Sequence, residues 1–210
     1  WNGDRYRYDP DGNLTGIEGV RSFAGIYDAF NHLTDLNTEG IHRKFLHNGR
    51  GQRVQRTLND HSRRYLYGPT GDLLAEIDEA QKVISCYVYC QGRLLAMVSG
   101  GKPWFYHADT CGHIICLTDE HGSVSASYTY DPFGYIIGKS GSLADNQPFT
   151  YCGLYGVMNE GGGLYFMKRR YYDSVTGRFI QKDPIGIVGG LNVYTYSGNN
   201  PVSYSDPEGL

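Results

Sequence analysis

The sequence has little of what marks proteins that bind nucleic acid or span membranes. Its formal net charge is -3 with 20% charged residues, so it lacks the basic field that nucleic acid would attract. The one basic run, Lys168 to Arg170, lies among aromatic residues and is interpreted as strand-surface charge. The longest apolar runs hold only a few residues, which excludes a membrane-spanning helix. The given residues show no signal-peptide pattern, and because they start at Trp1 we expect the natural N-terminus to lie upstream.

The sequence also lacks a disulfide framework. It has five cysteines, an odd number, in a chain too large to need disulfide bonds for stability. We therefore expect free thiols in a protein that folds in a reducing cytosol. Cys86 and Cys90 are spaced to share one face of a strand, and we expect both to be small core residues.

A metal centre is not expected either. Zinc sites favour closely spaced ligand pairs, whereas Cys111 and Cys116 lie on either side of a glycine turn. A Cys111–His113 nucleophile pair has no evident acid to orient the histidine. The sequence therefore predicts no metal and no cofactor. The histidines and cysteines weighed here are His107, Cys111, His113, Cys116 and His121.

Glycine and tyrosine are the abundant residues. The chain has 29 Gly and 19 Tyr against 8 Pro, and no segment shows a helical apolar stripe. Tyrosine favours half-buried pleated surfaces and glycine favours tight turns, so this composition predicts an all-β fold.

A unit of about twenty residues repeats along the first two thirds of the chain. Each unit holds an aromatic-x-aromatic strand end or a close variant, a polar turn that usually contains Gly, and an apolar residue that opens the next strand. Alternation along a strand places both aromatic residues on one face, which a single hairpin cannot bury. An ordinary antiparallel meander is the simpler alternative, but seven units in register favour a repeat array that forms one continuous β-ribbon. The units are YRYDPDGNL (6–14), GIYDAFNHL (25–33), FLHNGRGQR (45–53), YLYGPTGDL (65–73), YVYCQGRLL (87–95), WFYHADTCGHI (104–114) and YTYDPFGYI (128–136).

Two of these units, YRYDPDGNL and YTYDPFGYI, resemble the YD repeats of the Rhs family, which is related to toxin-complex C proteins and teneurins. The segment 164–210, LYFMKRRYYDSVTGRFIQKDPIGIVGGLNVYTYSGNNPVSYSDPEGL, resembles the Rhs repeat-associated core domain almost throughout. The resemblance implies a sheet that spirals into a hollow shell around a polymorphic toxin. It divides the chain into a shell region at 1–150 and a core domain at 151–210.

The resemblance also implies self-cleavage directly after the DPxGL motif, by a reaction like that of aspartic proteases. Such a reaction needs two nearby carboxyl groups, one ionised and one protonated. Asp183 of DPIG and Asp206 of DPEGL match the motif, and no other acid and no Lys or Arg lies between them. A neutral, desolvated segment would raise one carboxyl pKa, as this pair requires. We expect cleavage after Leu210, and we expect that the chain ends there because it was cut.

A DPxG tetrad by itself is also explained by a turn, because DPDG (9–12) and DPFG (131–134) occur in plain repeats. A nearby arginine could hold a carboxylate, and Arg178 of GRF is the weak candidate for that supporting role. We expect the segment 189–210 to thread into the shell as an extended plug that apolar and Tyr residues anchor.

The expected partners are the cleaved C-terminal toxin and the rest of the shell, with secretion proteins or a chaperone bound through an upstream region. We expect the protein in the bacterial cytoplasm before export to a target cell. Two alternatives stay open. One is a shell that encloses without proteolysis, and the other is a teneurin-like adhesion module on a cell surface.

Overall fold

The computed structural model describes residues 3–210 and contains two antiparallel sheets. Fourteen strands follow one another in chain order in the larger sheet, and four strands form the smaller one. The all-β ribbon of hairpins that the repeats predict is therefore confirmed. The strands of the larger sheet are β1 (Arg5–Tyr8), β2 (Leu14–Glu18), β3 (Phe23–Tyr27), β4 (Leu33–Thr38), β5 (Ile41–His47), β6 (Arg53–Leu58), β7 (His61–Tyr67), β8 (Leu73–Ile77), β9 (Val83–Cys90), β10 (Arg93–Ser99), β11 (Lys102–Ala108), β12 (Ile114–Thr118), β13 (Val124–Tyr130) and β14 (Ile136–Ser140).

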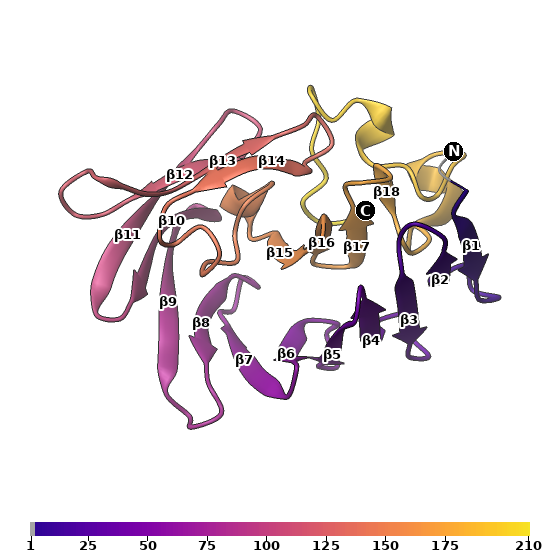
Figure 1. Ribbon diagram of the computed structural model, residues 1–210, viewed down its shortest axis with the longest axis horizontal. Helices are drawn as coiled ribbons and strands as arrows, with labels where there is room; N and C mark the ends of the chain where they lie inside the picture. Colours follow the sequence, from indigo (N-terminus) through magenta and orange to yellow (C-terminus); the bar gives the residue numbers. More distant parts are fainter. Residues whose placement is uncertain (1–2) are drawn as a thin grey trace.

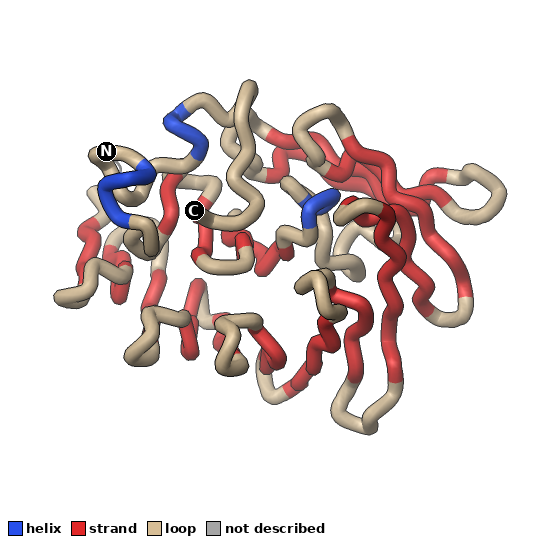
Figure 2. Tube along the Cα trace, turned by 180° about the vertical axis from the view of Figure 1, so that it is seen from behind, coloured by secondary structure: helices blue, strands red, loops and turns tan. Residues whose placement is uncertain are grey.

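The larger sheet curls around the smaller one, as Figure 1 shows. The enclosed sheet consists of β15 (Met158–Gly161), β16 (Leu164–Met167), β17 (Arg170–Asp173) and β18 (Arg178–Phe179), and we call it the plug sheet. Helical structure among the described residues is limited to the short 3-10 turns η1 (Gly153–Tyr155), η2 (Gly186–Gly189) and η3 (Ser197–Asn199), drawn blue in Figure 2. Among residues 3–210, no helix has the length and hydrophobicity that crossing a membrane requires.

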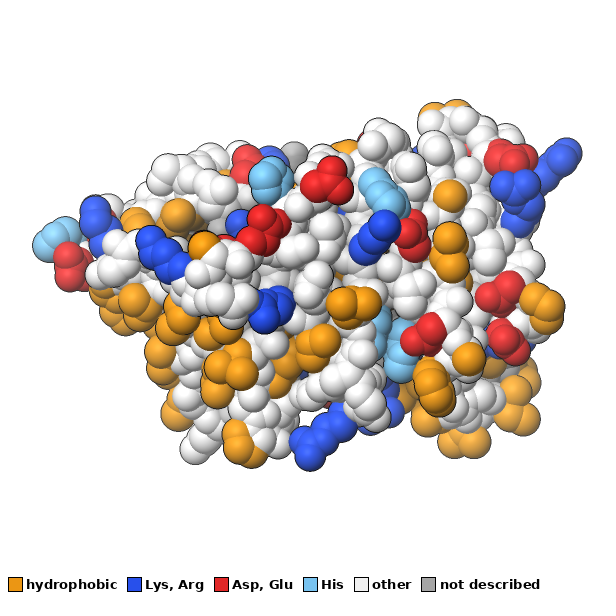
Figure 3. Space-filling view, turned by 90° about the horizontal axis from the view of Figure 1, so that it is seen from below, with side chains coloured by type: hydrophobic (Ala, Val, Ile, Leu, Met, Phe, Trp, Pro, Cys, Tyr) orange, Lys and Arg blue, Asp and Glu red, His pale blue; other side chains and the backbone are white. Residues whose placement is uncertain are grey.

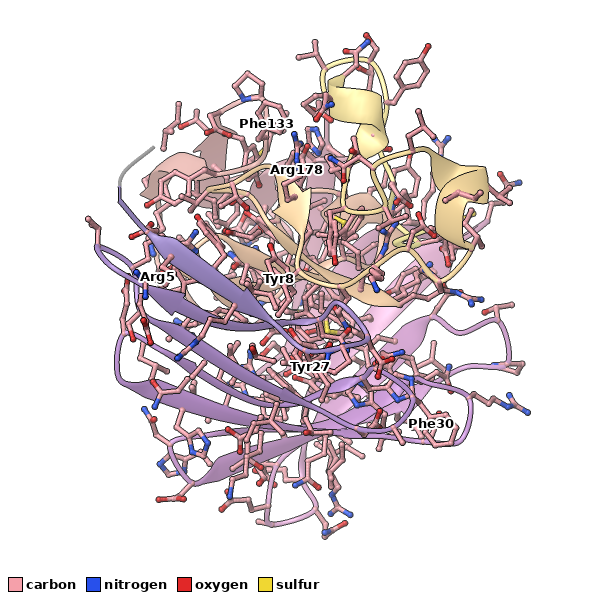
Figure 4. All side chains as sticks on the ribbon, turned by 90° about the vertical axis from the view of Figure 1, so that its right-hand side faces the viewer. Arg5, Tyr8, Tyr27, Phe30, Phe133 and Arg178 are labelled. Atoms are coloured by element: carbon pink, nitrogen blue, oxygen red, sulfur yellow. The ribbon has the colours of Figure 1, made fainter. Side chains whose placement is uncertain are left out.

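The repeated tyrosines face inward and connect neighbouring hairpins. Tyr27, labelled in Figure 4, donates its hydroxyl hydrogen to the Leu14 carbonyl at 2.9 Å. Tyr67 donates to the Arg53 carbonyl at 2.8 Å in the same way. Each bond joins one unit to the residue that opens a strand of the preceding unit. The second aromatic of the repeat therefore contributes both buried area and a partner for a backbone carbonyl.

A buried ion pair joins the shell to the plug sheet. Arg53 stands where other units have a leucine or isoleucine, and it is fully buried. Its Nη1 lies 2.5 Å from Oε1 of Glu160 on β15, which is also fully buried, and Arg56 binds the other oxygen of Glu160 at 3.2 Å. Burial opposes ionisation of Glu160, but the two arginines outweigh it and hold the pKa of this carboxyl below its usual value.

The outer face of the larger sheet is a mixture of charged and apolar side chains, which Figure 3 shows from below. It includes the middle residues of the aromatic triplets, such as Leu66 and Val88, which are about half exposed. Cys86 and Cys90 are exposed on this side too, so the expectation that they are core residues is wrong. Tyr87 and Tyr89 point inward, and alternation along β9 turns both cysteines outward. All five cysteines are free thiols.

Candidate functional site

The side chains of Asp183 and Asp206 meet at one guanidinium group. Nη2 of Arg170 lies 3.0 Å from Oδ2 of Asp183 and 3.4 Å from Oδ2 of Asp206. The Arg170 and Asp183 side chains are 2% and 7% exposed, and that of Asp206 is 17% exposed. Two acids that are 23 positions apart in the sequence therefore share one largely buried cation, and neither is bathed in solvent.

In each DPxG turn, only one oxygen of the aspartate carboxylate accepts hydrogen bonds from the turn itself. In the 183–186 turn, Oδ1 of Asp183 accepts the Ile185 N–H at 2.9 Å, and in the 206–209 turn Oδ1 of Asp206 accepts the N–H groups of Gly209 and Leu210. Asp131 closes its own DPxG turn with Oδ1 in a similar way, at Tyr135. Asp183 and Asp206 differ from Asp131 in the partner of their second oxygen, Oδ2, which in both faces Arg170.

Arg170 is fixed by its own surroundings. It opens β17 and is 1% exposed, and its Cζ lies 3.6 Å from the centroid of the Phe179 ring on β18. Nε donates to the Gly209 carbonyl at 2.8 Å, and Nη1 donates to the Val193 carbonyl at 3.2 Å. The interpretation of Arg170 as strand-surface charge is therefore wrong. Its guanidinium joins β17 to both acids and to the end of the chain.

Arg178 lies elsewhere. Its Nη1 donates to the side chain of Asn199 and to the Gly177 carbonyl, and neither acid is among its described contacts. Figure 4 shows Arg178 beside Phe133, well away from Phe30. The structure thus gives Arg170, and not Arg178, the contacts expected of a supporting arginine.

The peptide unit between Gly209 and Leu210 is held at both its carbonyl and its N–H group. The Leu210 N–H donates to Oδ1 of Asp206 at 3.0 Å, while the preceding carbonyl, of Gly209, accepts from Arg170. Gly209 has a φ of +69°, and a Cβ there would lie 2.5 Å from the Met167 carbonyl oxygen, so only glycine fits. Lys168 pairs with Glu208 nearby.

The two acids are electrostatically unequal. Burial raises the pKa of Asp206, and its hydrogen bonds from Leu210 and Gly209 and the charge of Arg170 offset only part of that effect. Asp183 has the shorter contact with Arg170. Burial lowers the pKa of the Arg170 guanidinium, but an arginine in this setting remains charged. Burial therefore makes ionisation of Asp206 less favourable than that of an exposed aspartate.

The segment that carries the acids is anchored by tyrosines but is not extended. Tyr196 is fully buried, with its ring 4.2 Å from that of Tyr172, and the Tyr194 hydroxyl donates to the Gly12 carbonyl at 2.8 Å. Within the expected plug, residues 189–210, turns, bends and the 3-10 segment η3 make up much of the backbone, and Leu191 and Val202 are exposed. The expectation of an extended plug that apolar residues anchor is therefore wrong.

A second cluster of ligand-type groups lies at the β11–β12 turn. Side-chain atoms of Asp109, Cys111 and His113 lie within 4.8 Å of one another. Oδ1 of Asp109 already accepts the N–H groups of the other two residues, and Nδ1 of His113 accepts the Cys152 N–H. Burial raises the pKa of the Cys152 thiol to about 12, so it is unreactive. Three ligands fall short of the four in structural zinc sites, and the absence of metal stays a prediction.

Fold and site together define a YD-repeat β-shell with a plug sheet inside and a paired-acid centre at its C-terminal end. The profile of the Teneurin YD-shell family matches residues 75–202. The chain therefore belongs to the Rhs/YD-shell family.

Curated proteins and solved structures are similar over nearly the whole chain. The tRNA3(Ser)-specific nuclease WapA of Bacillus spizizenii is 33% identical over 99% of this chain and 9% of its own length. Double-stranded DNA deaminase toxin A of Burkholderia cenocepacia is 27% identical over 100% of this chain and 17% of its own length. The crystal structure of TcdB2-TccC3 matches with a TM-score of 0.72 at 18% identity, over 99% of this chain and 14% of that chain. The chain thus spans less than a fifth of the length of these relatives.

Proposed function

We propose that residues 1–210 are the C-terminal part of a shell that encloses a toxin and cuts its own chain after Leu210. The observation that carries the proposal is the meeting of Asp183 and Asp206 beside the backbone of Leu210, with the pKa of Asp206 raised by burial. The names of the relatives support the toxin part, because a nuclease and a deaminase toxin both contain a region similar to this chain.

The proposed reaction uses both acids. The Asp183 carboxylate accepts a proton from a water molecule as the water oxygen attacks the Leu210 carbonyl carbon. Asp206 donates its proton to the carbonyl oxygen. When the tetrahedral intermediate collapses, the C–N bond breaks, the proton on Asp183 passes to the leaving amine, and Asp206 regains its proton from the hydroxyl group.

The chain's own geometry takes the place of substrate binding. Arg170 holds the Gly209 carbonyl and Asp206 holds the Leu210 N–H, so the groups on the N-terminal side of the bond are fixed before reaction. A tethered substrate reacts at a high effective concentration, which makes a binding pocket unnecessary and the reaction a single turnover.

The rest of the assignment follows from this role. The shell region is 1–150 and the core domain 151–210, although apolar residues of both regions pack into one shared core. The proposed partners are the released toxin, the remaining shell and delivery proteins bound upstream. The proposed course is folding in the bacterial cytoplasm and then delivery to a target cell.

A shell that closes without proteolysis is the second candidate. The observation in its favour is Arg170 itself, because a cation between two carboxylates stabilises both as ions. In that case the acids and the arginine would only tie down the chain end.

Three matched variants separate these functions. The polypeptide is expressed with its natural residues after Leu210, and fragments are followed by gel electrophoresis. Asp183→Asn and Asp206→Asn should leave it intact, whereas Asp131→Asn, in a DPxG turn without an arginine contact, should be cut like the parent. Cutting of all four proteins alike would exclude the two acids as the protease, whereas cutting of none would favour the non-proteolytic shell.

A further inference from the structure

A groove lies beside the paired acids and is not used by the reaction above. Its volume is about 680 Å³, within the range of ligand-binding pockets. One wall is formed by turns of the shell, including Phe30 and Arg50, and the other by the β16–β17 turn and residues 181–184. Asp183 and Arg170 line it, so the groove leads directly to the site. Figure 4 shows Phe30 projecting from the shell wall on this side.

The groove is basic although the chain as a whole is acidic. Six arginines and lysines line it against three acids, while the net charge of the chain is -3. Three of the six cations have carboxylate partners: Arg53 with Glu160, Lys168 with Glu208, and Arg170 with both site acids.

The other three cations, Arg50, Arg169 and Lys182, have no carboxylate within ion-pair distance among residues 3–210. They come from both walls, and all three are exposed. Asp11 is the one acid of the lining that has no cation partner in the described part of the chain. Unpaired cations on two facing walls form a surface that is complementary to an acidic segment.

We propose that this groove binds the residues directly after Leu210, and that these residues form an acidic peptide segment. The inference rests on the proposed function, in which the chain continues beyond Leu210. Glu208, two positions before Leu210, lines the groove, and consecutive Cα atoms are about 3.8 Å apart, so the residues just after Leu210 are within reach of it. Binding there would hold the leaving side of the bond while Arg170 and Asp206 hold the other side.

Carbodiimide coupling tests the proposal directly, because it joins a carboxylate to an amine with which it is in contact. It is applied to the uncut full-length polypeptide: the Asp206→Asn variant if the parent is cut, or the parent if it is not. The Lys168–Glu208 pair provides an internal control for the chemistry. Mass spectrometry should find Lys182 joined to an acid within the first several residues after Leu210. If the control amide forms and Lys182 is not joined to that segment, the proposal is wrong.

Charge reversal supplies a second readout. Arg169→Glu should reduce the coupling of Lys182 to that segment. When the parent is cut, Arg169→Glu and Lys182→Glu should each slow cleavage about threefold, as expected for partly exposed charge pairs. Arg93→Glu, at an exposed position of β10 outside the groove, should change nothing. Equal cleavage rates in the two groove variants and the parent would overturn the proposal while leaving self-cleavage itself intact, whereas an uncut parent would count against the proposed function alone.

Discussion

The replacement of Arg170 by methionine should destabilise the fold, because both site acids lose the cation that they share. Methionine keeps much of the length and apolar contact of arginine but cannot donate a hydrogen bond. The change leaves Asp183 and Asp206 largely buried without their shared cation, and it leaves the Gly209 and Val193 carbonyls without their donor. Removal of one member of a buried ion pair costs about 3–5 kcal/mol.

The loss should depend on pH, and its sign follows from the carboxyl groups. Burial already raises the pKa of Asp206, and without the charge of Arg170, which lowers it, that pKa should rise further above the value in the unfolded chain, which is about 4. An acid with a raised pKa stabilises the fold below that value and loses this contribution as the pH rises through the folded pKa. The Tm deficit of Arg170→Met relative to the parent should therefore be larger at pH 7 than at pH 3.5, where only the loss of the two carbonyl hydrogen bonds and of packing remains.

Thermal unfolding followed by circular dichroism measures this effect. For a chain of this size, a loss of 3–5 kcal/mol corresponds to a decrease in Tm of about 6–20 °C. Arg178→Met is the matched control, because Arg178 is half-buried and contacts neither acid, and its Tm should change by about 2 °C or less. An Arg170→Met protein with the same Tm deficit at both pH values would show that lost packing, and not exposed charge, is the cause.

Three further predictions concern the acids, the ion pair and the anchor. Asp206→Asn should abolish cleavage without lowering Tm at pH 7, because the raised pKa of Asp206 means that its ionised form opposes folding there. Arg53→Leu and Glu160→Gln should each cost about 3–5 kcal/mol in urea unfolding, whereas Arg53→Leu with Glu160→Leu should restore most of it. Tyr196→Ala should cost about 3–5 kcal/mol and slow cleavage, while Tyr196→Phe should preserve both; equal behaviour of the two variants would show that Tyr196 is no anchor.

The fold could be predicted because each strand of the larger sheet pairs with its neighbour in the sequence. Each hairpin joins neighbours in the sequence, so a period of about twenty residues with paired aromatics fixes strands, turns and order together. The face of Cys86 and Cys90 could also have been predicted. Their spacing shows only that they share a face, but the intervening Tyr87 and Tyr89 occupy the inner one.

The site could be predicted only in part. The motif identifies Asp183 and Asp206, but their common partner Arg170 lies outside the neutral segment that joins them, on β17. Nothing in the local sequence separates Arg170 from Lys168 or Arg169, because burial of one member of a charged run depends on how the chain end folds back. The unusual role of Arg53 could have been predicted from the sequence, since it is a charged residue at the strand-opening position where the other units have Leu or Ile.

The mass of the shell fragment made from the full-length polypeptide tests self-cleavage most directly. Self-cleavage by the two acids predicts a fragment whose last residue is Leu210 with a free carboxylate in the parent, and an unbroken chain when Asp206 is asparagine. An unbroken parent, or a parent fragment that ends at any other residue, would contradict it.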